Sequence, residues 1–163
     1  MARRKLTYAQ GSLFSVPLSD GSEALGLVAR LDGKGIVLAY FFVGTAAADA
    51  LRADRADLCA RVSDLDLLEG RWTVKGPLPG FTPAAWPVPR FRMFDPLRNR
   101  YTARTYGEDL SMQKGEEVLS EEEALTLPQA GLVGADSAVE ALDALKRAKK
   151  PTKPAAPPKR RAA

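Results

Sequence analysis

Histidine is absent from this 163-residue chain, and Cys59 is its only cysteine. A zinc site usually draws three or four ligands from His, Cys and carboxylates, and most nucleophilic mechanisms rely on a His base. These deficits exclude Ser–His–Asp triads, Cys–His dyads, haem axial histidines, iron–sulfur clusters and disulfide frameworks. We therefore predict no catalytic residues, no metal and no cofactor, with Cys59 as a buried structural thiol. A small carboxylate-dependent hydrolase is the weakest alternative.

Long apolar runs are also missing. The longest, residues 36–43, is strand-sized and far shorter than the roughly 20 residues of a membrane span. The basic N-terminal lead-in, residues 1–7, does not open into an apolar signal-peptide core. With 45% hydrophobic residues, the chain is predicted to form one globular domain over residues 8–146, in a soluble, cytoplasmic protein without a membrane partner.

The formal net charge of +4 is an average over two unlike parts. The segment from Lys146 to the end holds eight basic residues and no acid. Removing these eight from the 24 basic residues leaves 16 against 20 acids, which gives residues 1–145 a charge of −4. A mildly acidic body favours a basic partner.

The C-terminal tail, residues 147–163, is rich in Lys, Pro and Ala and has no large apolar side chain. Such a segment buries too little surface to offset its ordering entropy, so it is predicted to be disordered. Two interpretations stay open: a solvated terminus, or an arm that touches nucleic acid through phosphates. The second would use the tail residues Lys149, Lys150, Lys153, Lys159, Arg160 and Arg161.

Strand patterns dominate the first half of the body. Apolar runs over residues 13–18, 23–30 and 36–43 are separated by turns that contain Asp20-Gly21 and Asp32-Gly33. Asp-Gly between such runs is a strong hairpin signal, because glycine adopts the positive φ that tight hairpins need. We predict a three-stranded antiparallel meander, with the third run, apolar on both faces, as its central strand.

Further along, residues 58–62, 71–76, 91–94 and 100–106 have strand patterns, and residues 46–54 favour a helix beginning after Thr45. Residues 77–89 contain five prolines and predict an irregular connection. Capping-box sequences at Ser120 and Ser137 predict two helices near the C-terminus. The predicted fold is mainly β (α+β): an antiparallel meander or small barrel-like sheet of about six or seven strands with one or two C-terminal helices.

The opening of the chain resembles a known family. Residues 8–21 place a Gly–polar–hydrophobic strand before Val16-Pro17-Leu18 and the Asp20-Gly21 turn, and Gly26-Leu27-Val28 follows on the next strand. This pattern is similar to the opening of the immunity protein 26 family. Residues 72–77, residues 86–89 and Leu127-Pro128 are compatible with it, so the resemblance runs from about residue 8 to residue 145.

The resemblance implies an immunity protein of a bacterial polymorphic toxin system, which binds a cognate toxin without covalent chemistry and neutralises it. It implies no catalytic residues and no cofactor. Many toxins of such systems are nucleases, whose nucleic-acid-binding surfaces are basic. The acidic body agrees with this independently, since an acidic inhibitor is steered to such a surface and can occlude it.

Acidic residues and one tryptophan are the candidate contacts with a toxin. They are Glu108, Asp109, Glu116, Glu117, Glu121, Glu122, Glu123 and Trp86. The competing interpretation is that the acids are solvated, with those at a helix start stabilised by the helix dipole. Trp86, beside Pro87 in the irregular connection, is either an interface anchor or a core residue, whereas Trp72 is predicted to be core.

The alternative function is a small β-barrel module that binds nucleic acid and has a basic C-terminal arm. Aromatic and basic residues alternate over residues 90–106, and such a stretch on a sheet can stack bases and hold phosphates. The residues are Phe91, Phe94, Tyr101, Tyr106, Arg90, Arg92, Arg98, Arg100 and Arg104. The competing interpretation is that the aromatics face the core and the arginines pair with acids.

Overall fold

An antiparallel meander opens the fold. The computed structural model describes residues 5–44 and 51–149, and in it β1 (Ser12–Pro17), β2 (Glu23–Leu31) and β3 (Ile36–Phe42) pair in chain order. Gly21 and Gly33 occupy the two turns with φ of 84° and 73°. The predicted meander is therefore confirmed, and β3, buried from Val37 onward, lies in the interior of the sheet between β2 and β4.

The meander is the centre of a six-stranded mixed sheet with the order β5-β1-β2-β3-β4-β9. The predicted strand over residues 58–62 is confirmed as β4 (Leu58–Ser63), which pairs with β3 in antiparallel register. β5 (Thr73–Pro77) and β9 (Leu132–Val133) form the two edges, and β9 runs parallel to β4. Because these edges do not pair with each other, the sheet is open. The barrel-like version of the prediction is wrong.

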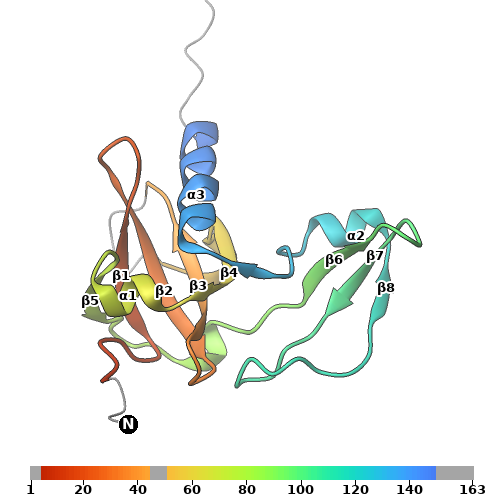
Figure 1. Cartoon of the computed structure of the whole chain (residues 1–163), viewed down its shortest axis with the longest axis horizontal. Coiled ribbons are helices and arrows are strands. Elements are labelled where there is room, and N and C mark those ends of the chain that lie inside the picture. The colour runs from red at the N-terminus through yellow and green to blue at the C-terminus, as the bar shows by residue number, and fades with distance from the viewer. Residues whose placement is uncertain (1–4, 45–50, 150–163) are drawn as a thin grey trace, which may run out of the picture.

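A three-stranded sheet forms a second lobe (Figure 1). It consists of β6 (Phe91–Asp95), β7 (Arg100–Arg104) and β8 (Glu117–Leu119) in antiparallel order, which confirms the hairpin predicted over residues 91–106. The strand total exceeds the predicted number because β8 and β9 have only three and two residues. Strands this short have no period that a sequence pattern can reveal.

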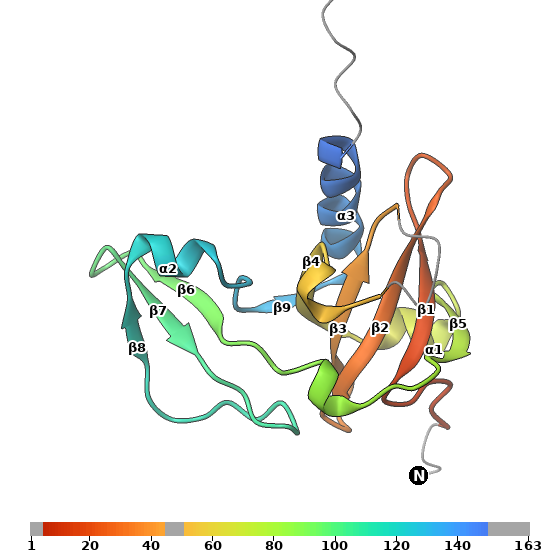
Figure 2. The same ribbon diagram turned by 180° about the vertical axis from the view of Figure 1, so that it is seen from behind.

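One extended segment joins the two lobes. The Arg92 amide donates to the Pro128 carbonyl at 2.8 Å, and the Ala130 amide donates to the Arg92 carbonyl at 2.8 Å, which places residues 128–130 along β6. The same segment then continues into β9 beside β4. Figure 2 shows this path from behind.

Both faces of the six-stranded sheet are covered. On one face Phe14, Phe41 and Trp72 pack with Leu142 of α3 (Ala135–Lys149), so Trp72 is a core residue as predicted. Near this face the short helix α1 (Leu65–Glu69) contributes Leu67. On the other face Leu27, Tyr40 and Phe42 pack with Trp86 and Phe91 from the proline-rich connection and the start of β6. The connection replaces a second layer of regular structure.

The helix starts follow the predictions only in part. α2 (Glu121–Leu125) begins with the predicted capping box, since the Glu123 amide donates to Ser120 Oγ at 3.1 Å. The expected N-cap at Ser137 is wrong, because α3 already begins at Ala135 and the Ala138 amide donates to the Gly134 carbonyl at 2.9 Å.

The predicted boundary at residue 146 falls inside α3, which continues to Lys149. Lys146, the last residue of the predicted domain, pairs with Asp20 at 2.8 Å, and Lys149 of the predicted tail pairs with Asp57 at 2.7 Å, so both cations hold the helix to the body. The expected helix over residues 46–54 falls mostly on residues 45–50, which lie outside the described residues, as does the tail from residue 150. Residues 53–55 form the 3-10 turn η2 (Ala53–Arg55). No helix within residues 5–44 and 51–149 is long and apolar enough to cross a membrane.

Candidate partner-binding surface

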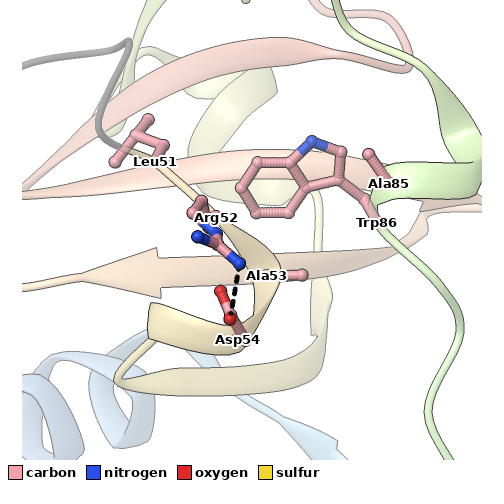
Figure 3. Close-up of a pocket in the computed structure, with 6 residues that line it drawn as sticks. All are labelled: Leu51, Arg52, Ala53, Asp54, Ala85 and Trp86. Carbon is pink, nitrogen blue, oxygen red and sulfur yellow. Dashed lines mark hydrogen bonds and ion pairs between the residues drawn. The ribbon is translucent and has the colours of Figure 1, made fainter.

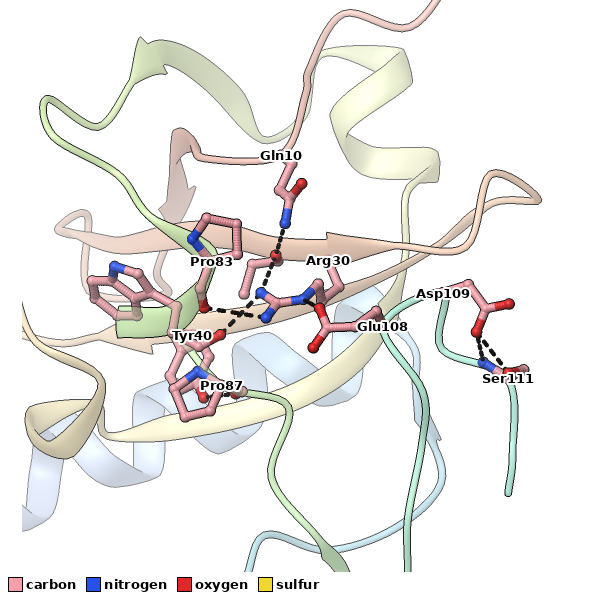
Figure 4. Close-up of polar contacts among 10 residues, drawn as sticks. Gln10, Arg30, Tyr40, Pro83, Pro87, Glu108, Asp109 and Ser111 are labelled. Carbon is pink, nitrogen blue, oxygen red and sulfur yellow. Dashed lines mark hydrogen bonds and ion pairs between the residues drawn. The ribbon is translucent and has the colours of Figure 1, made fainter. Parts of the chain in front are cut away.

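The structure divides the predicted acidic contacts into two groups. Glu108 and Asp109 lie in the loop between β7 and β8, next to Arg30 of β2 (Figure 4). Asp109 accepts hydrogen bonds from the Ser111 hydroxyl at 2.6 Å and the Ser111 amide at 3.1 Å. These bonds favour the ionised carboxylate and lower the pKa of Asp109.

Arg30 holds the loop and the proline-rich connection together from a buried position. Its guanidinium donates to the carbonyls of Ala29 at 2.7 Å, Trp86 at 3.0 Å and Pro83 at 3.1 Å, and its Nε donates to Glu108 (Figure 4). The charge of Glu108 is thus already matched within the chain. The sequence analysis missed Arg30, although an arginine at the end of an apolar strand is itself a signal of a buried, fully bonded guanidinium.

The second group of acids lies at the start of β8, just before it, and at the start of α2. Glu117 pairs with Arg90 at 2.7 Å, and Glu116 lies 3.9 Å from Arg104. We call Glu121, Glu122 and Glu123 the α2 acidic turn. All three are exposed, and among the described residues Glu121 and Glu122 form no ion pair. Glu123 accepts a hydrogen bond from the Ser120 hydroxyl at 3.1 Å.

Trp86 is not a protruding anchor. Its side chain packs edge-to-face on Tyr40 and Phe42, with centroid distances of 5.2 and 6.0 Å, and the residue is only 3% exposed. The indole does form one wall of a pocket of about 350 Å³, opposite Leu51 and Arg52 (Figure 3). Trp86 therefore packs in the core of the chain, and its role in binding a partner stays a prediction.

A second hollow lies where the two lobes meet. We call it the junction pocket; its volume is about 530 Å³. It is lined by Tyr40, Ala53, Asp54, Ala56, Asp57, Leu58, Cys59, Pro87, Pro89, Thr126, Leu127 and Pro128. The lining is mainly apolar, and its two charged members are carboxylates. Nothing in the sequence pattern brings these four segments together.

Two weakly acidic groups, Tyr40 and Cys59, line this pocket. Tyr40 donates a hydrogen bond to the Pro87 carbonyl, and Cys59 is half-buried beside it on the neighbouring strand. Desolvation raises the pKa of Cys59 to about 12 and also raises the pKa of Tyr40. Both groups are therefore protonated at neutral pH, so the thiol is not poised as a nucleophile.

In the basic-aromatic stretch, residues 90–106, some side chains are buried in the fold and others are exposed. Phe91 and Tyr106 are buried edge-to-face at 5.5 Å, whereas Phe94 is 48% exposed and lies 5.0 Å from Tyr101. Most of its arginines have partners: Arg90 and Arg104 face acids, Arg98 lies 3.8 Å from Asp95, and Arg92 donates to the Leu127 carbonyl at 2.9 Å.

Arg61 of β4 lies over the Tyr106 ring, 4.1 Å from its centroid. Within the described residues the buried Nε atoms of Arg61, Arg100 and Arg104 have no hydrogen-bond partner. β7 places Arg100 and Arg104 on the same face of the small sheet as Phe91, because directly paired residues share a face.

The residues that carry the family resemblance have structural roles. Gly11 and Gly21 have φ of 88° and 84°, and Gly26 lies directly against the Phe14 ring. These positions account for the meander and leave the choice of partner to other residues. In the part of the chain that the structure describes, no group of three or more His, Cys, Asp or Glu side chains could hold a metal ion. No family model, curated protein or solved structure matches the chain.

Proposed function

We propose that this protein is an immunity protein that binds a cognate bacterial toxin and neutralises it by non-covalent occlusion. The observation that carries the proposal is the α2 acidic turn, whose exposed Glu121 and Glu122 have no cationic partner among the described residues. Separated from the turn by two residues, Thr126 and Leu127 line the junction pocket. Exposed charge beside an apolar hollow is a common arrangement for protein recognition.

A basic toxin, such as a nuclease, is the partner that this surface favours. Exposed carboxylates such as Glu121 and Glu122 steer a cationic surface during encounter, and the effect falls with ionic strength because exposed charges are screened beyond about 8 Å at physiological salt. The apolar hollow would supply the salt-resistant part of the affinity. The resemblance to the immunity protein 26 family points to the same function.

Nucleic-acid binding stays as the second candidate. It is favoured by Arg61 and Arg100, which lack acidic partners among the described residues, and by the basic residues from Lys150 onward. Burial of Phe91 and Tyr106 weakens it, because their rings are not free to stack on bases.

The decisive experiment is affinity capture from a nuclease-treated lysate of the host organism. The baits are the full chain and a chain ending at Lys149, which keeps α3 and its ion pair with Asp57. A double variant, Glu121→Lys with Glu122→Lys, tests the acidic turn. Its matched control, Asp136→Lys with Glu140→Lys, reverses two exposed acids on α3.

We expect one protein to be retained by both baits and by the α3 control through a high-salt wash. Expressed alone that protein should arrest growth, co-expression of the full chain should restore growth, and the α2 double variant should fail to do so. If no such toxin is captured and only the full chain retains nucleic acid, the immunity proposal is wrong and the second candidate replaces it.

A further inference from the structure

We infer that a hollow beside Asp64 receives one arginine side chain of a partner protein, with its guanidinium on the Asp64 carboxylate. We call it the Asp64 hollow; its volume is about 620 Å³, and it is lined by Leu6, residues 33–35 of the β2–β3 turn, Asp64, Leu65 and Leu68. This size is within the range in which proteins enclose small ligands. The site goes beyond the proposed function, because α1 packs on the six-stranded sheet and α2 belongs to the other lobe (Figure 1).

Asp64 is a buried charge without a cationic partner. In the part of the chain that the structure describes, the buried charged residues are Arg30, Asp64 and Asp66, and Asp64 is 5% exposed. The first pairs with Glu108 and the last with Arg71. Asp64 forms no ion pair with any described residue. Burial of an ionised group is unfavourable unless an opposite charge compensates it, so the missing cation points to a ligand.

The Asp64 carboxylate is held in place with one oxygen available. Oδ2 accepts a hydrogen bond from the Tyr8 hydroxyl at 2.7 Å, and no described residue donates to Oδ1. The Asp64 amide donates to the Gly35 carbonyl at 3.0 Å, and the Leu68 amide donates to the Asp64 carbonyl at 2.9 Å. A Cβ built at Gly35 would lie 3.5 Å from Oδ1, so this oxygen is next to the lining of the hollow. A fixed acceptor loses little conformational entropy on binding.

The surroundings of Asp64 do not neutralise its charge. Burial raises the pKa of Tyr8, and the carboxylates of Asp64 and Asp32 raise it further, so Tyr8 stays a neutral donor at neutral pH. Lys34 lines the hollow, yet over residues 5–44 and 51–149 it takes part in no ion pair. The unmatched negative charge therefore attracts a cation from outside these residues.

The walls of the hollow suit the stem and the head group of arginine. Leu6 and Leu65 are 45% and 47% exposed, and Leu68 is half-buried. Long basic side chains lay their methylene groups along such apolar surface. Gly33 and Gly35 contribute only backbone, whose carbonyls suit the five N–H donors of a guanidinium. Arginine is favoured over lysine because a guanidinium is less strongly hydrated and loses less on entering a buried site.

The test titrates capped amino acids into the isotopically labelled full chain at constant ionic strength and follows amide chemical shifts. The probe is Ac-Arg-NH2, whose only charge is the guanidinium. Ac-citrulline-NH2 keeps the shape without the charge, and Ac-Lys-NH2 tests the head group. We expect the probe to shift the amides of Gly35, Asp64 and Leu65. Capped citrulline should bind at least roughly tenfold more weakly, and capped lysine should also bind more weakly than the probe.

Two variants localise the binding. Asp64→Asn removes the charge and keeps an oxygen for Tyr8, and its control, Glu69→Gln, makes the same change at an exposed acid of α1. Leu65→Lys adds a cation at an exposed position of the lining, where the risk to folding is small. Its control is Leu97→Lys, at a 95% exposed position in the β6–β7 turn. We expect Leu65→Lys to weaken the probe at least roughly tenfold, and Asp64→Asn to do the same if its melting curve shows a folded protein.

A second chain, with Arg3→Gln and Arg4→Gln, removes the arginines that precede Lys5. Binding of the probe to this chain alone would mean that the protein fills the hollow with its own arginine, and would overturn the inference. Tighter binding of free arginine than of capped arginine would overturn it too, since it indicates a small-molecule site.

Absence of binding to both chains, equal binding of capped citrulline, or unchanged binding by a folded Leu65→Lys variant would likewise overturn the inference. These outcomes are separate from failure of the proposed function, which is decided by the capture and growth experiments.

Discussion

Gly26 is the clearest case of a single residue dictated by packing. It pairs with Phe14 across β1 and β2, and a Cβ built at Gly26 would lie 2.7 Å from Phe14 Cε1 and closer still to Cζ and Cε2. Phe14 has no exposed surface and stacks parallel to Trp72 at 5.5 Å, so the ring has no free space into which it could move. Glycine is required here for close approach and not for its backbone conformation.

The substitution Gly26→Ala is expected to destabilise the fold by about 1–3 kcal/mol, the usual cost of overpacking a core. Urea unfolding followed by tryptophan fluorescence measures it. Gly134→Ala is the control, because the Cβ there meets no atom within 4 Å and the glycine does not have a positive φ. A loss at Gly26 no larger than at Gly134 would contradict this account of Phe14.

Cys59 makes the stability of the fold sensitive to alkaline pH. In the unfolded chain its thiol ionises near its ordinary pKa of 9.0, whereas in the folded protein the pKa is raised to about 12. Between these values the unfolded state loses a proton that the folded state keeps. The free energy of unfolding therefore falls as pH rises, by up to about 1.4 kcal/mol per pH unit.

Urea unfolding of the wild-type protein and of Cys59→Ala, from about pH 8 to about pH 11, tests this dependence. The variant should lose stability less steeply than the wild type above pH 9.0. Tyr8, whose pKa is also raised, contributes equally to both proteins. The pKa of Tyr40 is raised first by desolvation and then by Cys59, so the difference between the two profiles reports the Cys59–Tyr40 pair. Parallel profiles would show that the thiol does not couple to folding.

At the scale of elements, a buried arginine helps to order the proline-rich connection. Residues 78–90 contain little regular structure, yet Leu78 and Trp86 are buried against the sheet. Arg30, itself 4% exposed, donates to the carbonyls of Pro83 and Trp86, and the Pro83 carbonyl also accepts from the Trp86 amide at 3.1 Å. No strand ladder supplies donors to these carbonyls, since proline has no N–H to donate. A buried cation thus replaces the hydrogen bonds of a strand.

Replacing Arg30 with Met is expected to cost about 1–3 kcal/mol, because it removes the donor to the Trp86 carbonyl, whereas the Pro83 and Ala29 carbonyls keep their bonds from the Trp86 amide and from Gln10. Glu108→Gln is the matched variant: the Glu108 side chain is 77% exposed, so its loss should cost less than about 1 kcal/mol. Thermal unfolding of both variants distinguishes the contribution of the carbonyl hydrogen bonds from that of the ion pair with Glu108. Equal losses would mean that the ion pair, and not the carbonyl bonds, holds the connection.

Two serines with the same capping-box sequence have different roles. Ser120 caps α2, whereas Ser137 lies in the first turn of α3. Ser120→Ala should therefore cost about 1 kcal/mol, while Ser137→Ala should be neutral or slightly stabilising because alanine favours helix. Chemical denaturation measures both, and a reversed order would contradict the helix starts described above.

For the whole molecule, the two lobes have unequal cores. The six-stranded sheet is packed on both faces, with Phe14, Phe41 and Trp72 on one side and Tyr40, Phe42 and Trp86 on the other. The separate core between the small sheet and α2 contains three buried residues, Ala103, Leu119 and Ala124. The smaller lobe therefore gains less from burial of apolar surface.

Native-state hydrogen exchange should reveal this difference. Amides of β3 are expected to exchange only by global unfolding, whereas those of β7 and β8 should open at a lower free energy. Exchange measured at several low urea concentrations is the control. The free energy of global opening falls steeply with urea, whereas that of local opening changes little, because local opening exposes less surface. A single opening energy for both sheets would show that residues 128–133 make the molecule one cooperative unit.

Local chemistry allowed most elements to be predicted. Asp20-Gly21 and Asp32-Gly33 gave the meander, and Ser120 gave the start of α2, because turns and caps depend on residues that are neighbours in the chain. β8, β9 and the start of α3 at Ala135 were missed, because their positions depend on pairing with distant segments.

The properties of the candidate surface also divide into those that the sequence predicted and those that depend on distant contacts. Composition by itself determined that the body is acidic and that histidine and disulfide chemistry are excluded, since these properties depend only on counting residues. Only the tertiary structure decided that Glu108 faces Arg30, that Trp86 is buried, and that Cys59 and Leu127 share a pocket. Those facts arise from contacts between residues far apart in the chain, which no local pattern encodes.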